Sequence, residues 1–143
     1  MARYLLDTNA ISDALKNPQG RVAEKLRSIS PPNRVCTSIV VAAELRYGAA
    51  KKGSPVLAER VEAFLQAMDV LPLNGDADRC YGLLRADLER RGEPIGANDM
   101  FIAAHAVASN SILVTANTRE FSRVRGLKVE NWLLPASRSR RRT

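Results

Sequence analysis

Four acidic residues of this 143-residue chain stand in or beside segments of small and apolar residues, an unusual setting for charge. Asp7 follows the apolar run RYLL, Glu44 lies within VVAAELRYGAA, and Asp99 lies at the start of ANDMFIAAHAVA. Glu120 follows a further apolar segment, SILVTAN, which ends in Asn117. A buried carboxylate is costly unless a cation or hydrogen-bond donors accompany it. The pattern therefore marks these positions as candidates for ion binding or catalysis.

Several acids gathered at one place would raise one another's pKa unless positive charge lay between them. Lysine or arginine could supply that charge, but a divalent metal ion would relieve the repulsion best. Oxygen ligands favour Mg²⁺, with Mn²⁺ as a substitute, over zinc. His105 is the chain's one histidine, and it lies about 240° around the predicted helix from Asp99, so we expect it to pack elsewhere. A single histidine also disfavours a metal-free ribonuclease, and the chain has no GxSxG, P-loop or GxGxxG motif.

Each acid also has a structural interpretation. Asp7 could cap the helix that follows it, Asp99 could satisfy the amides at the start of its helix, and Glu120 could be an exposed acid in a turn. Asp76 and Asp78 follow an outer strand, and we expect them to cap the next helix.

Apolar runs and helical patterns alternate along the chain. The pattern predicts strands over 3–7, 34–37 and 70–73 and within 111–117 and 126–132. Between them it predicts a helix that begins after Ser38 and fades toward Gly53, helices over 56–67 and 97–109, and an amphipathic helix that carries Tyr81, Leu84 and Leu88. Continuous apolar strands separated by helices indicate an α/β fold, with a parallel sheet of about five strands covered on both faces.

In such a sheet, ligands bind at the carboxyl ends of the strands. Asp7 ends the first strand and belongs at that edge directly. Glu44 lies six residues after Ser38, about 9 Å along its helix, and helical side chains lean back toward the helix start. Asp99 opens a helix that feeds a strand, so the start of this helix returns to the same edge. We therefore expect the acids to meet there.

Composition sets the wider frame. The length predicts one domain, over 1–134, followed by a basic, disordered tail over 135–143. The net charge is +7, and without the four arginines of the tail it is +3, which weakly favours a polyanionic partner. Cys36 and Cys80 form no CxxC motif, so we expect no disulfide framework and a reducing, cytoplasmic setting. We expect neither a signal peptide nor a membrane span.

Four segments resemble one family of proteins in their order along the chain: LLDTNAIS, SIVVAAELRYGA, IGANDMFIAAHAVA and LVTANTREFSRVRGLKVENW. Together they resemble the PIN-domain ribonucleases, and specifically the VapC-type toxins of bacterial toxin-antitoxin modules. The resemblance implies a three-layer α/β/α fold with parallel strand order 3-2-1-4-5. It also implies a magnesium-dependent endoribonuclease that inhibits translation, forms a homodimer and is neutralised by a VapB-type antitoxin.

The family's metal-binding acids carry over to Asp7, Glu44 and Asp99. Many relatives have an aspartate where this chain has Asn117, and Glu120 is the nearest acid, so the fourth catalytic position is open between them. By the same resemblance, Thr8 or Asn9, together with Thr115, orient ligands or water, and Asn117 is a further candidate for that role. The segments NTREF and GLKVENW look most like toxins that cut the anticodon loop of initiator tRNA.

Mechanistically, the expectation is that Asp7, Glu44 and Asp99 hold one or two Mg²⁺ ions and that water attacks the phosphate, leaving 5′-phosphate and 3′-hydroxyl ends. RNA would be held by basic residues, for which the candidates are Arg46, Lys51, Arg85, Arg119 and Arg123. Two alternatives remain: a nuclease of the same fold that acts on other RNA or on DNA, and a catalytically idle PIN module that binds nucleic acid.

Overall fold

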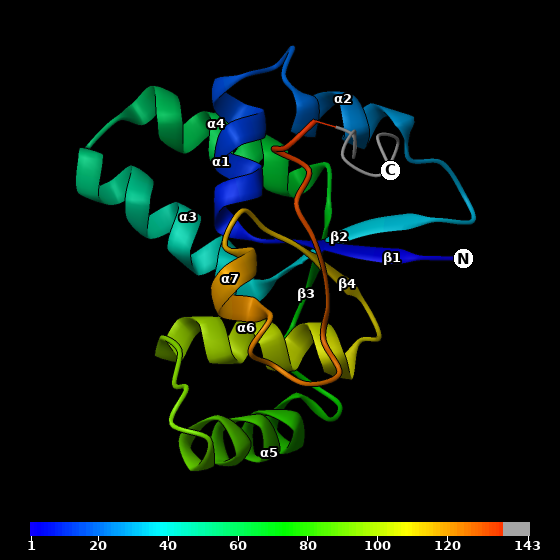
Figure 1. The fold of residues 1–143 in the computed structure, drawn as a ribbon. Helices are drawn as coiled ribbons and strands as arrows, with labels where there is room; N and C mark the ends of the chain where they lie inside the picture. The colour runs from blue at the N-terminus through cyan, green and yellow to red at the C-terminus, as the bar shows by residue number, and fades with distance from the viewer. Residues whose placement is uncertain (136–143) are drawn as a thin grey trace.

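The computed structural model of the protein describes residues 1–135 and contains one five-stranded sheet (Figure 1). Its strands are parallel and lie in the order β3-β2-β1-β4-β5. The strands are β1 (Arg3–Leu6), β2 (Arg34–Ser38), β3 (Asp69–Leu71), β4 (Ile112–Val114) and β5 (Lys128–Glu130). The predicted fold class and strand order are thus confirmed. The expected tail, 135–143, lies outside the described residues except for Pro135.

Seven helices are described between and beyond these strands. They are α1 (Thr8–Lys16), α2 (Arg21–Ser28), α3 (Ile39–Lys52), α4 (Pro55–Gln66), α5 (Ala77–Arg90), α6 (Ala97–Ala108) and α7 (Thr118–Phe121). Figure 1 shows α1, α2 and α4 on one side of the sheet and α5 and α6 on the other, with α3 and the start of α4 projecting beyond the carboxyl ends of the strands. Connections between parallel strands are right-handed crossovers. The chain moves from β1 through β2 to β3 in one direction across the sheet, and then crosses to β4 and β5 in the other direction. The helices of these two halves therefore lie on opposite faces of the sheet. No helix within residues 1–135 has the length and apolarity that a bilayer crossing requires.

The core forms where the two central strands meet both helix layers. Consecutive residues of β1, Leu5 and Leu6, are fully buried, as are Leu113 and Val114 of β4. Successive side chains of a strand point to opposite faces of the sheet. Both can be buried only because helices cover both faces. Phe121 of α7 is also fully buried, which fixes this short helix against the core.

Helix α3 begins at a cap that also connects distant elements. The Oγ of Ser38 accepts a hydrogen bond from Val40 N and lies 2.7 Å from Nδ1 of His105, which belongs to α6. Gly53 ends the helix in the left-handed conformation, at φ 63°, which glycine adopts without steric cost. Helix α4 has a simpler cap, in which Ser54 Oγ accepts from Leu57 N.

Some local predictions differ from the structure. The third strand ends at Leu71, earlier than expected, and α2 and α7 are additional short helices. Asp76 occupies the position before α5 but makes no capping bond with its side chain, and Asp78 accepts a hydrogen bond only from the amide of its neighbour Arg79. The prediction that both aspartates cap α5 is therefore wrong. Both are exposed, so water already satisfies their carboxylates.

The double role of Ser38 gives a test of stability. Ser38→Ala should lower the free energy of unfolding by about 1–3 kcal/mol, because it removes a helix cap and one partner of the buried His105. Ser54→Ala removes a cap alone and should cost about 1 kcal/mol. Urea unfolding of the two variants measures the difference, and equal losses would show that the contact with His105 contributes nothing.

Candidate metal centre at the carboxyl edge

Asp7 is held at the end of β1 by neutral hydrogen-bond donors. The residue is 4% exposed and forms the N-cap of α1, where its Oδ1 accepts from Thr8 N at 2.8 Å. Its Oδ2 accepts from the Thr115 hydroxyl at 2.8 Å and from Asn9 Nδ2 at 3.4 Å. Asp7 is thus both a cap and a fixed carboxylate at the sheet edge.

The Thr115 hydroxyl is the centre of a small network next to Asp7. Besides donating to Asp7, it accepts from Asn9 Nδ2 at 3.1 Å and from the main-chain N of Asn117 at 3.0 Å. The Oδ1 of Asn9 in turn accepts from Ala116 N at 2.8 Å. Asn9 and Thr115 therefore lie where they orient Asp7, whereas Asn117 joins the network through its backbone.

Glu44 reaches the same edge from α3. The Thr8 hydroxyl donates to its Oε1, and Asn98 Nδ2 donates to its Oε2 at 3.3 Å. The Glu44 side chain is only half-buried. It is therefore less buried than its apolar neighbours in the sequence suggested. Within residues 1–135, no ion pair joins a lysine or arginine to Glu44 or to the other three acids. Neutral donors hold this carboxylate in place.

Of the other three acids, Glu120 has the largest effect on the pKa of Asp99. Asp99 lies in the first turn of α6 and is half-buried. Burial, followed by hydrogen bonding to Glu120 and repulsion from Glu120, Asp7 and Glu44, raises the pKa of Asp99 to about 8. Glu120 lies in α7, and its Oε1 is buried without a hydrogen-bond partner among the described residues.

The pKa of Asp7 shows the same mutual influence. Burial raises it above its ordinary value, hydrogen bonds from Thr115 and Thr8 oppose that change, and repulsion from Glu44 and Glu120 adds to it. Like charges that raise one another's pKa must lie near one another. The structure therefore places Asp7, Glu44, Asp99 and Glu120 close enough to repel one another, and their role as a metal site stays a prediction.

The residues present are suited to a divalent cation. The donors are all oxygens, the set that Mg²⁺ and Mn²⁺ prefer, and the unpartnered Oε1 of Glu120 adds a buried acceptor. In the described part of the chain, no three acid, histidine or cysteine side chains already converge closely enough to hold an ion. Glu44 is held by its hydrogen bonds from Thr8 and Asn98.

The other candidates from the sequence lie elsewhere. His105 is 3% exposed, and burial lowers its pKa despite a hydrogen bond to the Pro72 carbonyl, so its role in packing is confirmed. Cys36 and Cys80 are free thiols, and neither belongs to the acid cluster. Trp132 packs against Tyr4 with ring centroids 5.2 Å apart.

The basic residues named as RNA contacts divide into two groups. Arg46 forms a two-pronged ion pair with Glu62 at 2.7 and 2.9 Å, and Arg85 binds Glu89 and the Tyr81 hydroxyl. The guanidiniums of both residues are therefore already engaged within the protein.

Three others are less engaged. Lys51 lies over the ring of Tyr47, whereas Arg119 and Arg123 have no carboxylate partner among the described residues. Arg119 and Arg123 are thus the freer of the named arginines.

Asn98 is the residue of the site that the sequence analysis did not assign. It precedes Asp99 and is the other polar residue at the start of an otherwise apolar helix. That contrast was a usable signal. Its contact with Glu44 depends on the packing of α6 against α3, which no local pattern reveals.

Comparisons with known proteins agree with this fold. Residues 4–127 match the family model of the PIN domain. The tRNA(fMet)-specific endonuclease VapC of Shigella flexneri is 40% identical over 136 residues, covering 92% of this chain and 99% of that protein. Ribonuclease VapC2 of Rickettsia felis is 36% identical over 130 residues, covering 90% of this chain and 97% of that protein. The crystal structure of VapBC2 from Rickettsia felis bound to a DNA fragment from their promoter matches with a TM-score of 0.85 at 35% identity, covering 91% of this chain and 98% of that chain.

The raised pKa of Asp99 makes the stability of the metal-free protein depend on pH. The unfolded chain releases this proton near its ordinary pKa of 3.8, whereas the folded chain keeps it until about 8. The folded state binds more protons between these values, so in EDTA the free energy of unfolding should fall as the pH rises from about 4 to about 8. Urea unfolding at several pH values measures this slope.

Asp99→Asn should flatten that dependence, because it removes the carboxylate that resists ionisation. Asp78→Asn is the matched control, since Asp78 occupies the first turn of α5 but is exposed. An unchanged slope in Asp99→Asn would contradict the electrostatic account of the cluster.

Proposed function

The chain belongs to the PIN-domain family, and within it to the VapC ribonucleases, and we propose that it is a Mg²⁺-dependent endoribonuclease toxin. The observation that carries this proposal is the gathering of Asp7, Glu44, Asp99 and Glu120 at the carboxyl edge without a lysine or arginine pairing with any of them in the described chain. Such a cluster is unfavourable by itself and becomes favourable around a divalent ion.

The proposed substrate is tRNA, specifically the anticodon loop of initiator tRNA, and its cleavage would inhibit translation. Support comes from the relative in Shigella flexneri, which is named a tRNA(fMet)-specific endonuclease and is matched along 99% of its length. The proposed partner is a VapB-type antitoxin, because the matching structure from Rickettsia felis is a VapBC complex. The proposed homodimer rests on the family resemblance alone.

In the proposed site, the chain holds its acids at set positions before substrate arrives. Thr115 and Thr8 fix both oxygens of Asp7, and Asn9 fixes Thr115. These contacts keep the carboxylate in one orientation, which is how residues around metal ligands raise affinity. Asp7, Glu44, Asp99 and Glu120 would hold the cation, and a bound Mg²⁺ would neutralise their charge and polarise the scissile phosphate.

The protonation of Asp99 connects the site to its cation. A carboxyl with a pKa of about 8 is largely protonated at neutral pH, and a protonated carboxyl is a poor metal ligand. Ion binding must therefore release the proton of Asp99, so cation affinity should rise with pH through neutrality.

Replacement of Asp7 tests the proposed centre directly. Asp7→Asn keeps the side-chain shape and an acceptor for Thr8 N, so the fold should persist while Mg²⁺-dependent cleavage falls by about 100-fold or more. Asp76→Asn is the control, because Asp76 follows the outer strand β3, is exposed and should be dispensable.

The assay is cleavage of purified tRNA, with and without EDTA, followed by sequencing of the cut ends. The expected products carry 5′-phosphate and 3′-hydroxyl ends. Full activity of Asp7→Asn, purified free of wild-type protein, would refute the assignment.

A second pair of variants decides which residue completes the site. Glu120→Gln should lower cleavage about tenfold or more, the size of effect seen when groups that support a metal site are lost. It should also lower the pKa of Asp99, because it removes a neighbouring negative charge. Asn117→Ala should have little effect, because Asn117 joins the network through its main-chain N. If Asn117→Ala lowered cleavage more than Glu120→Gln did, Asn117 would be the residue that completes the site.

A further inference from the structure

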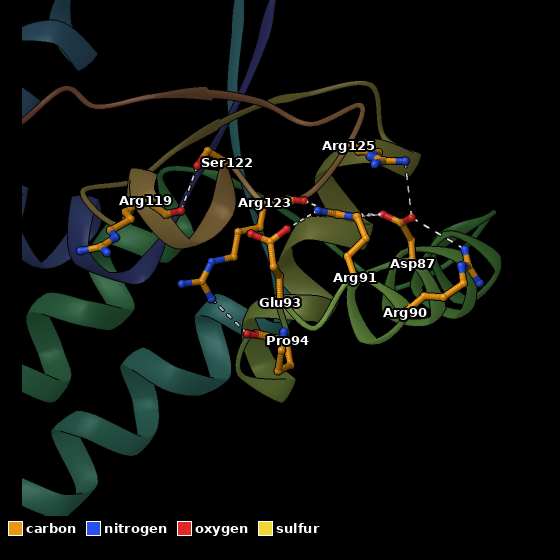
Figure 2. Close-up of polar contacts among 9 residues, drawn as sticks. All are labelled: Asp87, Arg90, Arg91, Glu93, Pro94, Arg119, Ser122, Arg123 and Arg125. Atoms are coloured by element: carbon orange, nitrogen blue, oxygen red, sulfur yellow. Dashed lines mark hydrogen bonds and ion pairs between the residues drawn. The ribbon is translucent and has the colours of Figure 1, made fainter.

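Several arginines lie on the segment that follows β4, which also carries Glu120, and at the end of α5 (Figure 2). We propose that Arg90, Arg119, Arg123 and Arg125, here called the arginine surface, bind phosphates of the RNA strand that the centre cuts. The identity of the strand as substrate rests on the proposed function, but the binding of RNA phosphates can be tested without it.

Two of these arginines flank the acids of the centre. Arg119 directly precedes Glu120, and Arg123 follows it by three residues. Arg123 also donates from Nη1 to the carbonyl of Pro94 at 3.1 Å, and Pro94 belongs to the loop that leads to Asp99. Figure 2 shows the Arg123 side chain directed toward this loop and Arg119 extending away from it. Arg119 and Arg123 are therefore the arginines nearest to Glu120 along the chain, and Arg123 also contacts the loop before α6.

The other two arginines continue the surface toward α5 and are loosely held. Arg125 and Arg90 each lie 3.7 Å from Oδ1 of Asp87, and their side chains are 75% and 71% exposed. Ion pairs with such exposure contribute little to stability. Both guanidiniums can therefore exchange this long contact for a phosphate at small cost.

Arg91 lies among these residues but serves the protein itself. Its guanidinium donates to Asp87 Oδ2 at 2.9 and 2.7 Å, to Glu93 at 2.5 Å and to the carbonyl of Arg123 at 2.6 Å. Its side chain is only 23% exposed. Arg91 thus ties the end of α5 to the segment after α7 and fixes the backbone that presents Arg123.

The balance of charge favours a polyanion at this surface. The arginine surface and Arg91 carry five positive charges, against the negative charges of Asp87, Glu93 and Glu120. A cluster of acids repels RNA, so a strand approaching the centre needs compensating positive charge close by. Guanidinium suits this role because its planar donors can bind phosphate oxygens in pairs and its charge persists at all physiological pH values.

The test is the salt dependence of binding to a short fluorescein-labelled RNA hairpin, measured by fluorescence anisotropy. Asp7→Asn is the parent, because the hairpin must remain uncut. Each phosphate contact contributes about 0.7 to the slope of log K against log salt on a single strand, so R119Q/R123Q/R125Q should lower the slope by about 2. The same loss weakens binding about 100-fold at about 0.1 M salt.

Arg34→Gln in the same parent is the matched control. Arg34 is exposed at the start of β2, on the amino edge of the sheet and so opposite the proposed centre. Arg34→Gln removes one positive charge from the protein but leaves the arginine surface intact. The salt slope and the affinity for the hairpin should therefore stay unchanged. The triple variant should unfold at a midpoint temperature within a few degrees of the parent's, which would show that the fold persists.

The outcomes separate this inference from the proposed function. If the wild-type chain cleaves RNA but the triple variant binds with the parent's slope and affinity, the arginine surface is overturned and the function stands. If the wild-type chain cleaves no RNA but the slope falls as expected, the surface stands and the function fails. A loss in Arg34→Gln of about one third of that in the triple variant, which is one charge against three, would show only general attraction by net charge and would also overturn the inference.

Discussion

Repulsion among carboxylates at one edge of the sheet is the constraint on which the remaining features depend. The strand order places β1 beside β4, and the helix layers lie on opposite sides of the sheet, an arrangement in which ligands bind beyond the carboxyl ends of the central strands. Asp7 enters it from β1, Glu44 from α3, Asp99 from α6 and Glu120 from α7. Four separate elements therefore contribute an acid to one edge, where a metal ion would relieve the repulsion, and burial together with the neighbouring acids raises the pKa of Asp99 to about 8.

The acids are oriented by hydrogen bonds rather than by cations. Thr8, Asn9, Asn98 and Thr115 donate to Asp7 and Glu44, and these neutral groups fix geometry without cancelling negative charge. An arginine in their place would have satisfied the carboxylates and removed the reason for an ion. Positive charge lies instead on the segment after β4 and at the end of α5, where we propose that it binds the phosphates of a strand.

The sequence predicted most of the fold because its strands are continuous apolar runs and its helices have clear starts. Asp7 and Asp99 could be placed by direction alone, since a strand end and the start of the helix feeding the next strand share one edge. The local details that were wrong depend on packing that a pattern does not encode. Asp76 and Asp78 look like caps but stay in water, and the contact of Asn98 with Glu44 exists only because α6 packs against α3. Arg46 and Arg85 looked available for RNA, yet each has a carboxylate partner within the fold.

The most direct test of the central claim is anomalous X-ray diffraction from crystals of the full chain grown or soaked with Mn²⁺ at about pH 8. The account predicts a strong anomalous peak at the carboxyl edge, about 2 Å from oxygens of Asp7, Asp99 and at least one of Glu44 and Glu120. A cluster that binds no ion under these conditions, with its carboxylates paired to lysine or arginine instead, would contradict it.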